Sequence, residues 1–287
     1  MQEQDFPALY RSADELSLAS QTHFFLALRA HLVTLVVAAI LSIVSIPHWS
    51  VAALQLATLL GALGCSVYLF ALRPDRLWYA GRAVAESVKT ITWRYVCRAE
   101  PFQGDDVKAR GDFHQKLKAV VEQNRQVVQA LTEHLDGPQI TQVMEQMRAR
   151  PLEERRATYA SHRIRNQLAW YAKKAAFNRR MSRGFFWVLI ATNSIAVVCA
   201  IVRITCPDKP FWPTDVFVAI AASLLSWMQA KRFSELAGSY ALTAHEISLI
   251  REQSLLPDTD ERFSLFVGDA ENAFSREHTQ WIARKDV

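Results

Sequence analysis

The sequence predicts an all-α integral membrane protein in which two transmembrane helical hairpins, four spans in all, are continued by long cytoplasmic helices. Residues 51–72 carry no charge over 22 positions, and at 1.5 Å per residue they extend about 33 Å, enough to cross a hydrocarbon core of roughly 30 Å. Residues 184–202 form a second uncharged run of 19 positions. The third observation is that basic residues crowd the ends of these runs.

Two weaker apolar runs stand beside the strong ones across short turns. They cover 32–47 and 213–230, and the second contains Asp215 near its start. Runs of this length are also found as buried core helices, so a wholly buried bundle in a soluble protein is the alternative. The pairing of each weak run with a strong neighbour favours hairpins. The predicted spans are about 30–47, 51–72, 184–202 and 213–230.

The distribution of charge predicts which side of the membrane each segment occupies. Residues 73–183 hold 22 Lys and Arg against 12 Asp and Glu, whereas the hairpin turns are poor in basic residues. By the positive-inside rule, the middle segment and both the N- and C-termini are cytoplasmic in a multi-pass protein of the inner (plasma) membrane. Anionic lipid headgroups account for the basic middle, so the bilayer is the expected partner and no nucleic acid is expected.

Several features speak against an enzyme or a secreted protein. The N-terminus is polar and acidic, without the basic and apolar regions of a signal peptide. The four cysteines have neither disulfide-framework nor zinc-site spacing, and no HExxH, P-loop, GxSxG or GxGxxG motif occurs. We therefore expect no catalytic residues, no metal and no cofactor.

The polar segments also have helical patterns. Residues 112–135 place apolar side chains near one face, Gly137-Pro138 interrupts the pattern, and a further helix is expected around 139–149. Asp258 and Glu261 have capping-box spacing, which predicts that a helix begins there. We expect these helices to form a bundle beneath the membrane.

The two halves share an order of polar helix, hydrophobic hairpin and polar helix. Gln21-x-x-Phe24-Phe25 precedes the first span, and Gln167-x-x-Trp170-Tyr171 precedes the third. Because both hairpins run in the same sense, the chain is interpreted as a parallel tandem repeat.

Several sequence stretches resemble those of a known family. The stretch 77–95, LWYAGRAVAESVKTITWRY, followed by Pro101-Phe102, is similar to the SLATT family, the SMODS and SLOG-associating two-transmembrane effector domain. The upstream Tyr10-x-x-Ala13-Asp14 fits the same pattern. In the second half, 275–281 (SREHTQW), Trp170-Tyr171 and Tyr240-x-x-Thr243-x-x-Glu246 resemble another version of the domain.

This resemblance implies two tandem units: a first over 1–104, a helical cytoplasmic linker over 105–150 and a second over 151–287. It further implies a pore-forming effector of a prokaryotic conflict or anti-phage system, linked with nucleotide-second-messenger synthases and nucleotide sensors. The chain departs from the simplest pattern by holding two units and no recognisable fused sensor. A separate synthase or sensor protein is then the expected partner, together with further copies of the chain in a homo-oligomer.

Polar residues inside the spans are candidates for lining a pore. They recur at helical spacing, although faces of small polar residues also serve helix packing. An amide side chain in lipid needs a hydrogen-bond partner. The candidates are Gln55, Thr58, Asn193, Ser223 and Ser226. Arg29 and His31 stand at the mouth of the first span, where they either form a ring of cations or snorkel to lipid phosphates.

A second group of residues is expected to organise the cytoplasmic bundle. Glu86 has helical ion-pair spacing to Arg82 and Lys89, and the resemblance adds Glu246, Arg276 and Glu277. The functional alternative to a pore is a membrane-anchored scaffold or signal transducer whose cytoplasmic helices recruit partners. The sequence leaves open the ion or solute that passes, the activating signal and the subunit number.

Overall fold

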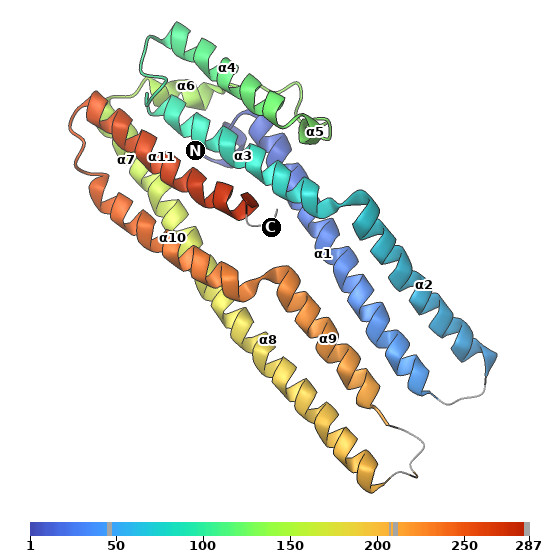
Figure 1. The fold of residues 1–287 in the computed structure, drawn as a ribbon. Helices are drawn as coiled ribbons and strands as arrows, with labels where there is room; N and C mark the ends of the chain where they lie inside the picture. The colour runs from blue at the N-terminus through green and yellow to red at the C-terminus, as the bar shows by residue number, and fades with distance from the viewer. Residues whose placement is uncertain (45–47, 207, 209–211, 284–287) are drawn as a thin grey trace. The chain divides into compact units, whose positions relative to one another are not determined.

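The computed structural model describes residues 1–44, 48–206, 208 and 212–283, with side chains as far as Ser275. Over these ranges the chain is helical and contains no strand. Figure 1 shows the order of the elements. They are η1 (Glu3–Asp5), α1 (Ala8–Ile43), α2 (Trp49–Leu72), α3 (Pro74–Val96), α4 (Asp106–Gln123), α5 (Arg125–Val128), α6 (Gln142–Arg148), α7 (Leu152–Tyr159), η2 (Ala160–Ile164), α8 (Arg165–Thr205), α9 (Thr214–Lys231), α10 (Phe233–Gln253) and α11 (Asp260–Ala283).

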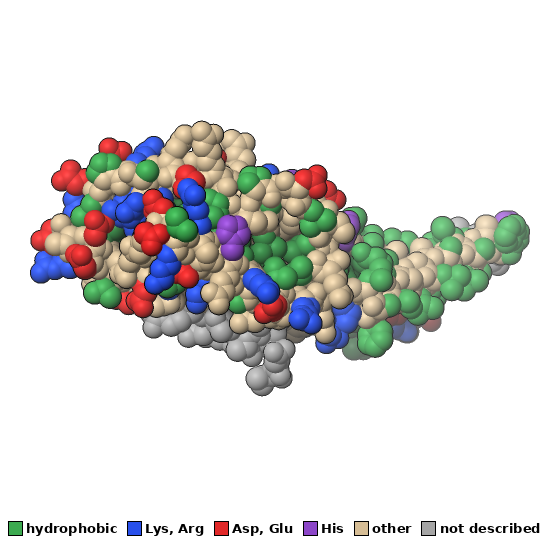
Figure 2. Space-filling model, turned by 90° about the horizontal axis from the view of Figure 1, so that it is seen from above, with side chains coloured by type: hydrophobic (Ala, Val, Ile, Leu, Met, Phe, Trp, Pro, Cys, Tyr) green, Lys and Arg blue, Asp and Glu red, His purple; other side chains and the backbone are tan. Residues whose placement is uncertain are grey.

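The helices divide into two units. The polar unit consists of Met1–Gln21, Asp75–Ala172 and Ala241–Val287, and the apolar unit consists of Thr22–Pro74 and Lys173–Tyr240. Helices α1, α8 and α10 each begin in one unit and end in the other. In Figure 2, acidic and basic side chains gather over the polar unit, and hydrophobic side chains dominate the visible surface of the apolar unit.

Among the residues that the structure describes, three helical stretches are long and apolar enough to cross a membrane. They are Ala8–Ile43, Trp49–Val96 and Leu152–Thr205, and only 6 to 11% of each apolar window is buried inside the protein. Phe70 on α2, for example, is 84% exposed. Contiguous apolar surface on this scale is rare on soluble monomers and is typical of a surface that lipid or another protein covers. Helix α9 occupies the predicted fourth span but is not among these three.

Side chains tie the helices of the apolar unit together. His31 on α1 makes a 3.1 Å hydrogen-bond contact through Nδ1 with the Ala62 carbonyl on α2, and the Ser66 hydroxyl lies 3.3 Å from the same nitrogen. Phe25 on α1 packs edge-on against Trp227 on α9, with ring centroids 5.7 Å apart. Helix α1 therefore contacts both α2 and α9.

Aromatic residues form the core of the polar unit. Trp93 on α3 is buried and contacts Phe6 and Tyr159, whose ring centroids lie 6.4 Å and 5.7 Å from its own. Tyr159 in turn contacts Phe263 on α11. The family-like stretch 77–95 thus supplies the centre of this core, which explains its aromatic content.

The prediction of one helix over 112–135 is wrong. Helix α4 begins at Asp106, where the Asp105 carboxylate accepts hydrogen bonds from two backbone N–H groups, and it ends at Gln123. The Asn124 side-chain amide donates to the Val120 carbonyl at 2.8 Å, an interaction that competes with helix continuation. The short helix α5 then ends at Val128, and Leu135 is exposed.

The helix near 258 begins one residue later than the predicted capping box. The Thr259 hydroxyl accepts a hydrogen bond from the backbone N–H of Arg262 at 3.3 Å, so Thr259 caps α11. Asp258 pairs instead with the Arg262 guanidinium at 2.9 Å.

Gly81 gives a first prediction, because α1 and α3 approach closely there. A Cβ at Gly81 would lie 3.1 Å from the Ala13 carbonyl oxygen and 3.3 Å from the Ser17 nitrogen, both backbone atoms. Gly81→Leu should therefore lower stability by about 1–3 kcal/mol through overpacking. Gly111 on α4 has open space around it, so Gly111→Leu is the matched control and should not destabilise. Equal melting temperatures of the two purified variants in detergent would contradict the close approach.

Candidate functional site

Two buried arginines hold the C-terminal end of α3. Arg148 of α6 donates from Nη1 to the Tyr95 carbonyl at 2.7 Å and from Nε to the Asp106 carboxylate at 2.9 Å. Arg155 of α7 donates from Nη1 to the Cys97 carbonyl at 2.8 Å and also pairs with Asp260 at the start of α11. The last carbonyls of a helix have no partner within it, and a guanidinium satisfies them while complementing the helix dipole.

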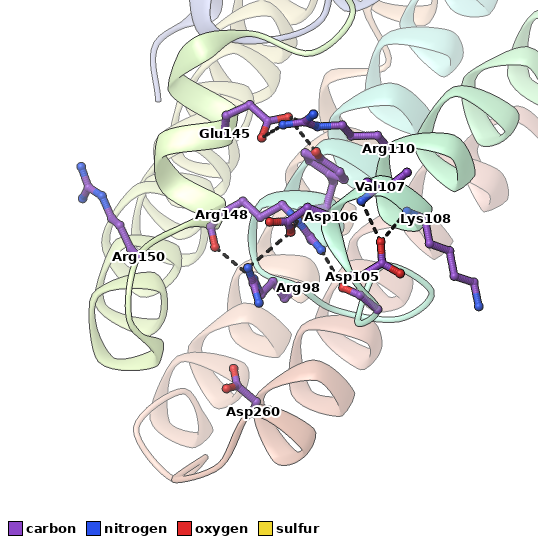
Figure 3. Close-up of polar contacts among 12 residues, drawn as sticks. Arg98, Asp105, Asp106, Val107, Lys108, Arg110, Glu145, Arg148, Arg150 and Asp260 are labelled. Carbon is purple, nitrogen blue, oxygen red and sulfur yellow. Dashed lines mark hydrogen bonds and ion pairs between the residues drawn. The ribbon is translucent and has the colours of Figure 1, made fainter.

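A carboxylate on α6 links the same region to α4. Figure 3 shows Arg110 pointing at Glu145, to which it donates from Nε at 3.0 Å and from Nη2 at 2.9 Å. The Tyr95 hydroxyl donates to the same carboxylate at 3.0 Å. The hydrogen bond from Arg110 holds the pKa of Glu145 below its usual value, whereas burial, followed by the bond to Glu145, raises the pKa of Tyr95 to about 12.

The most deeply buried charge in this unit is the Glu271 carboxylate on α11. Arg163 donates to it twice, from Nε at 2.9 Å and from Nη2 at 2.7 Å, and the Tyr159 and Thr90 hydroxyls each donate at 3.0 Å. Glu271 is fully buried and Arg163 is nearly so. We call these four residues the Glu271 clamp. It joins α3, α7, η2 and α11 through a carboxylate that accepts four hydrogen bonds.

The clamp includes a break in helical regularity. Residues Ala160–Ile164 form a π-helical turn, in which the Arg165 N–H bonds to the Ala160 carbonyl, five residues back. Such turns contain one extra residue and are frequent at functional sites. Tyr159 precedes this turn and Arg163 lies within it, and both donate to the same carboxylate.

The electrostatics of the clamp keep it ionised. Burial by itself lowers the pKa of Arg163, but the adjacent Glu271 carboxylate outweighs it, so the pKa lies above its ordinary value. Burial and then the charge of Glu271 raise the pKa of Tyr159 well above normal. Arg163 is therefore a cation and Tyr159 a neutral donor at any physiological pH. This arrangement positions helices. Among the described residues, no group of three His, Cys, Asp or Glu side chains could hold a metal.

The residues predicted to organise the bundle lie elsewhere in the polar unit. Arg82 stacks over the Trp170 ring at 5.7 Å, and Lys89 lies 5.9 Å from the Tyr10 ring centroid. Glu86 is half-buried and acts electrostatically on Tyr10 and Asp14. Glu246 is exposed on α10. The side chains of Arg276 and Glu277, on α11, lie outside the described residues. The organising role of the five predicted residues, Arg82, Glu86, Glu246, Arg276 and Glu277, stays a prediction.

The candidate pore residues occupy three helices of the apolar unit. Gln55, Thr58 and Ser223 are half-buried, whereas Asn193 and Ser226 are exposed. The Thr58 hydroxyl donates to the Gln55 carbonyl at 2.8 Å, and the Asn193 amide donates to the Leu189 carbonyl at 3.0 Å. Over the described residues, no hydrogen bond joins the side chains of these five to one another.

The two residues at the predicted pore mouth have different surroundings. His31 is half-buried and makes the contacts with α2 described above. Arg29 is exposed, and its guanidinium carbon lies 5.6 Å from the Trp227 ring centroid. Whether either residue faces a pore stays a prediction.

Sequence reasoning missed the clamp and the two arginines that cap α3. A signal was present, because each charge stands on an apolar helical stripe. Glu271 follows Val267 by four residues and precedes Phe274 by three, Arg148 follows Met144 by four, and Arg163 follows Tyr159 by four. A charge on a buried stripe requires a buried partner.

The fold and the site together define an all-helical protein in which membrane-capable helices continue into a bundle fixed by buried arginine contacts. Two family matches give this class its name. Residues 7–156 match SMODS and SLOG-associating 2TM effector domain 3, and residues 159–281 match SMODS and SLOG-associating 2TM effector domain 1. The chain belongs to the SLATT family and carries two of its domains in tandem. No curated protein and no solved structure matches it.

The clamp spans both matches. Thr90 lies in the first match, and Tyr159, Arg163 and Glu271 lie in the second. Residues 157–158 separate the two matches, and the π-helical turn begins one residue into the second match. Residues 105–150, interpreted above as a linker, fall within the first match, and the exact unit boundaries stay a prediction.

Removing one member of the clamp should be costly. Glu271→Leu leaves the Arg163 charge buried without its counter-ion, and we expect a loss of about 3–5 kcal/mol in the free energy of unfolding. The double variant Arg163→Met, Glu271→Leu should recover much of this loss. Arg262→Met, which removes the exposed pair with Asp258, should change little. Denaturant unfolding of the purified chain measures all three, and a double variant as unstable as the single one would contradict the clamp.

The Arg110–Glu145 pair should contribute to stability in a pH-dependent manner. Because folding lowers the pKa of Glu145, the contribution is complete above the ordinary glutamate value of about 4.3 and is lost as the pH falls through the lowered value. The melting temperatures of the native chain and Arg110→Met should therefore differ at neutral pH and converge in acid. Lys118→Met, at the exposed Lys118–Glu122 pair, is the control. A gap that persists to the most acidic pH would refute this assignment.

Proposed function

We propose that this chain is a membrane-embedded effector of a prokaryotic conflict system that assembles as a homo-oligomer and permeabilises the inner membrane when triggered. The observation that carries the proposal is the surface of the spans. Their apolar windows are only 6 to 11% buried, and they continue into a charged helical bundle within a chain that has two effector-domain matches. Such a surface requires lipid or further protein around it.

We further propose four spans, with α9 as the fourth. Its 18 residues are about 27 Å long at 1.5 Å per residue, close to the thickness of a hydrocarbon core. The basic residues that flank the spans favour an arrangement in which both termini and the middle segment are cytoplasmic.

The exposed polar side chains of the spans support assembly with further copies. Asn193 and Ser226 face outward on a single chain, and an amide in hydrocarbon gains from a partner on another helix. Four helices of one chain do not easily enclose a water-filled channel, so a symmetric ring of copies is the expected form.

The helices shared by both units offer a route for control. Helix α8 runs without interruption from the π-helical turn beside the clamp into the third predicted span. A shift of the bundle would thus be transmitted mechanically to the span. We propose that a separate nucleotide-second-messenger synthase or sensor supplies the trigger. We infer no catalytic step.

The alternative function is a membrane-anchored scaffold or signal transducer. The extensive charged surface of the polar unit is the observation that favours it. In that case the spans serve only as an anchor, and the polar side chains within them have no role in transport.

Substitution of the intramembrane amides separates the two functions. For a pore we expect Gln55→Leu and Asn193→Leu to change ion or dye flux through liposomes that contain the purified chain, because these amides would contact water or a neighbouring copy. Val197→Leu, at an exposed apolar position of α8, is the matched control and should leave flux unchanged. A barrier that stays intact in triggered cells, measured by dye uptake and membrane potential, would remove the pore and leave the scaffold.

A further inference from the structure

Three helices of the apolar unit bring cations together around an aromatic pair. Arg29 on α1 and Lys231 on α9 both lie over the Trp227 ring, with the Arg29 guanidinium carbon 5.6 Å and the Lys231 Nζ 5.1 Å from its centroid. The Lys231 Nζ also lies 3.2 Å from the centroid of Phe25. Lys174 on α8 is close enough, as is Arg29, to act electrostatically on Lys231.

Arg29 and Lys231 repel one another, so this pair is stabilised by a nearby negative charge. Within the described residues, neither Arg29 nor Lys231 has a carboxylate within 4 Å. By contrast, Arg232, next in the chain, makes a bidentate pair with Glu235, and its Nε donates at 2.7 Å. The aromatic faces of Phe25 and Trp227 supply partial negative charge, but they carry no counter-ion. Arg29 and Lys231 therefore share these rings without a carboxylate partner among the described residues.

The location and surroundings of the cluster indicate the chemical class of that anion. Arg29 directly precedes the first predicted span, and Lys231 directly follows the fourth. Exposed apolar side chains lie alongside, among them Leu26 on α1 and Phe177 on α8. A ligand that fits has a negatively charged head and an apolar tail. Guanidinium and ammonium groups are the usual partners of phosphate oxygens.

We propose that Arg29 and Lys231 form a phosphate-binding site that takes the headgroup of an anionic phospholipid. Phe25 and Trp227 form the floor of the site, and the acyl chains lie along the exposed apolar faces of α1 and α8. The lipid would join the two predicted hairpins, because its phosphate neutralises charges from α1 and α9 at once. This inference rests on the proposed membrane embedding.

Lipid retention tests the site. The purified full chain would be reconstituted in bilayers of phosphatidylcholine and phosphatidylglycerol, extracted in mild detergent and analysed for bound lipid. We expect selective retention of phosphatidylglycerol. Arg29→Gln and Lys231→Gln should each reduce that selectivity about tenfold, the effect of losing one charge-assisted contact. Lys231→Arg should preserve the selectivity for phosphatidylglycerol. That result would show that the loss of selectivity in Lys231→Gln comes from the missing charge and not from a folding defect.

Arg183→Gln is the matched control, since it removes one positive charge from the exposed basic flank of the third span. Equal loss of selectivity in Arg183→Gln would overturn the site in favour of diffuse attraction to anionic membranes. A second experiment measures the binding of inorganic phosphate to the delipidated chain. If millimolar phosphate binds the delipidated chain through Arg29 and Lys231 while phosphatidylglycerol is not retained, the lipid assignment is overturned. A chain that fails to enter bilayers at all would contradict the proposed function itself, whereas one that enters without lipid selectivity would contradict only this site.

Discussion

The buried carboxylate of Glu271 imposes the main constraint on the polar unit. A full negative charge in a protein interior is tolerated only when its lone pairs are satisfied and a counter-ion is adjacent. Arg163, Tyr159 and Thr90 meet both conditions, and they come from segments far apart in sequence. A rearrangement that moved α11 away from η2 would strand both charges, and one that moved α11 away from α3 would remove the Thr90 hydrogen bond. The helices around the clamp are therefore fixed relative to one another more firmly than apolar packing alone would fix them.

Solvent explains why the chain separates into two units. In the polar unit, charged side chains gather on the surface apart from the buried Glu271 and the buried arginines, and the aromatic residues around Trp93 are enclosed. In the apolar unit the large hydrophobic side chains point outward, so few of them are enclosed by the protein. Each arrangement suits a different surrounding medium. Helices α1, α8 and α10 pass from one unit to the other without interruption, so the boundary between the units falls within continuous helices.

The long apolar helices could be predicted from composition, whereas the helix ends that depend on single side chains could not. The apolar runs 51–72 and 184–202 fall within α2 and α8, because twenty consecutive apolar residues leave a backbone few alternatives to a helix. The break at Asn124 and the cap at Thr259 depend on single side chains that bond to backbone groups, which periodicity does not register. The clamp was missed for another reason. Its four residues are brought together by tertiary folding, and the charges of Glu271 and Arg163 on apolar stripes indicated only that partners existed.

The π-helical turn at Ala160–Ile164 has a consequence for helical phase. Arg155, Tyr159 and Arg163 are buried at intervals of four residues. In an α-helix, side chains four residues apart differ in direction around the helix axis by about 40°, and a π-helical turn, which has more residues per turn, reduces that difference. The extra residue also offsets everything that follows it by about 100° from the phase of an unbroken α-helix. The helical phase with which α8 begins is therefore set by one surplus residue at the junction of the two matched domains.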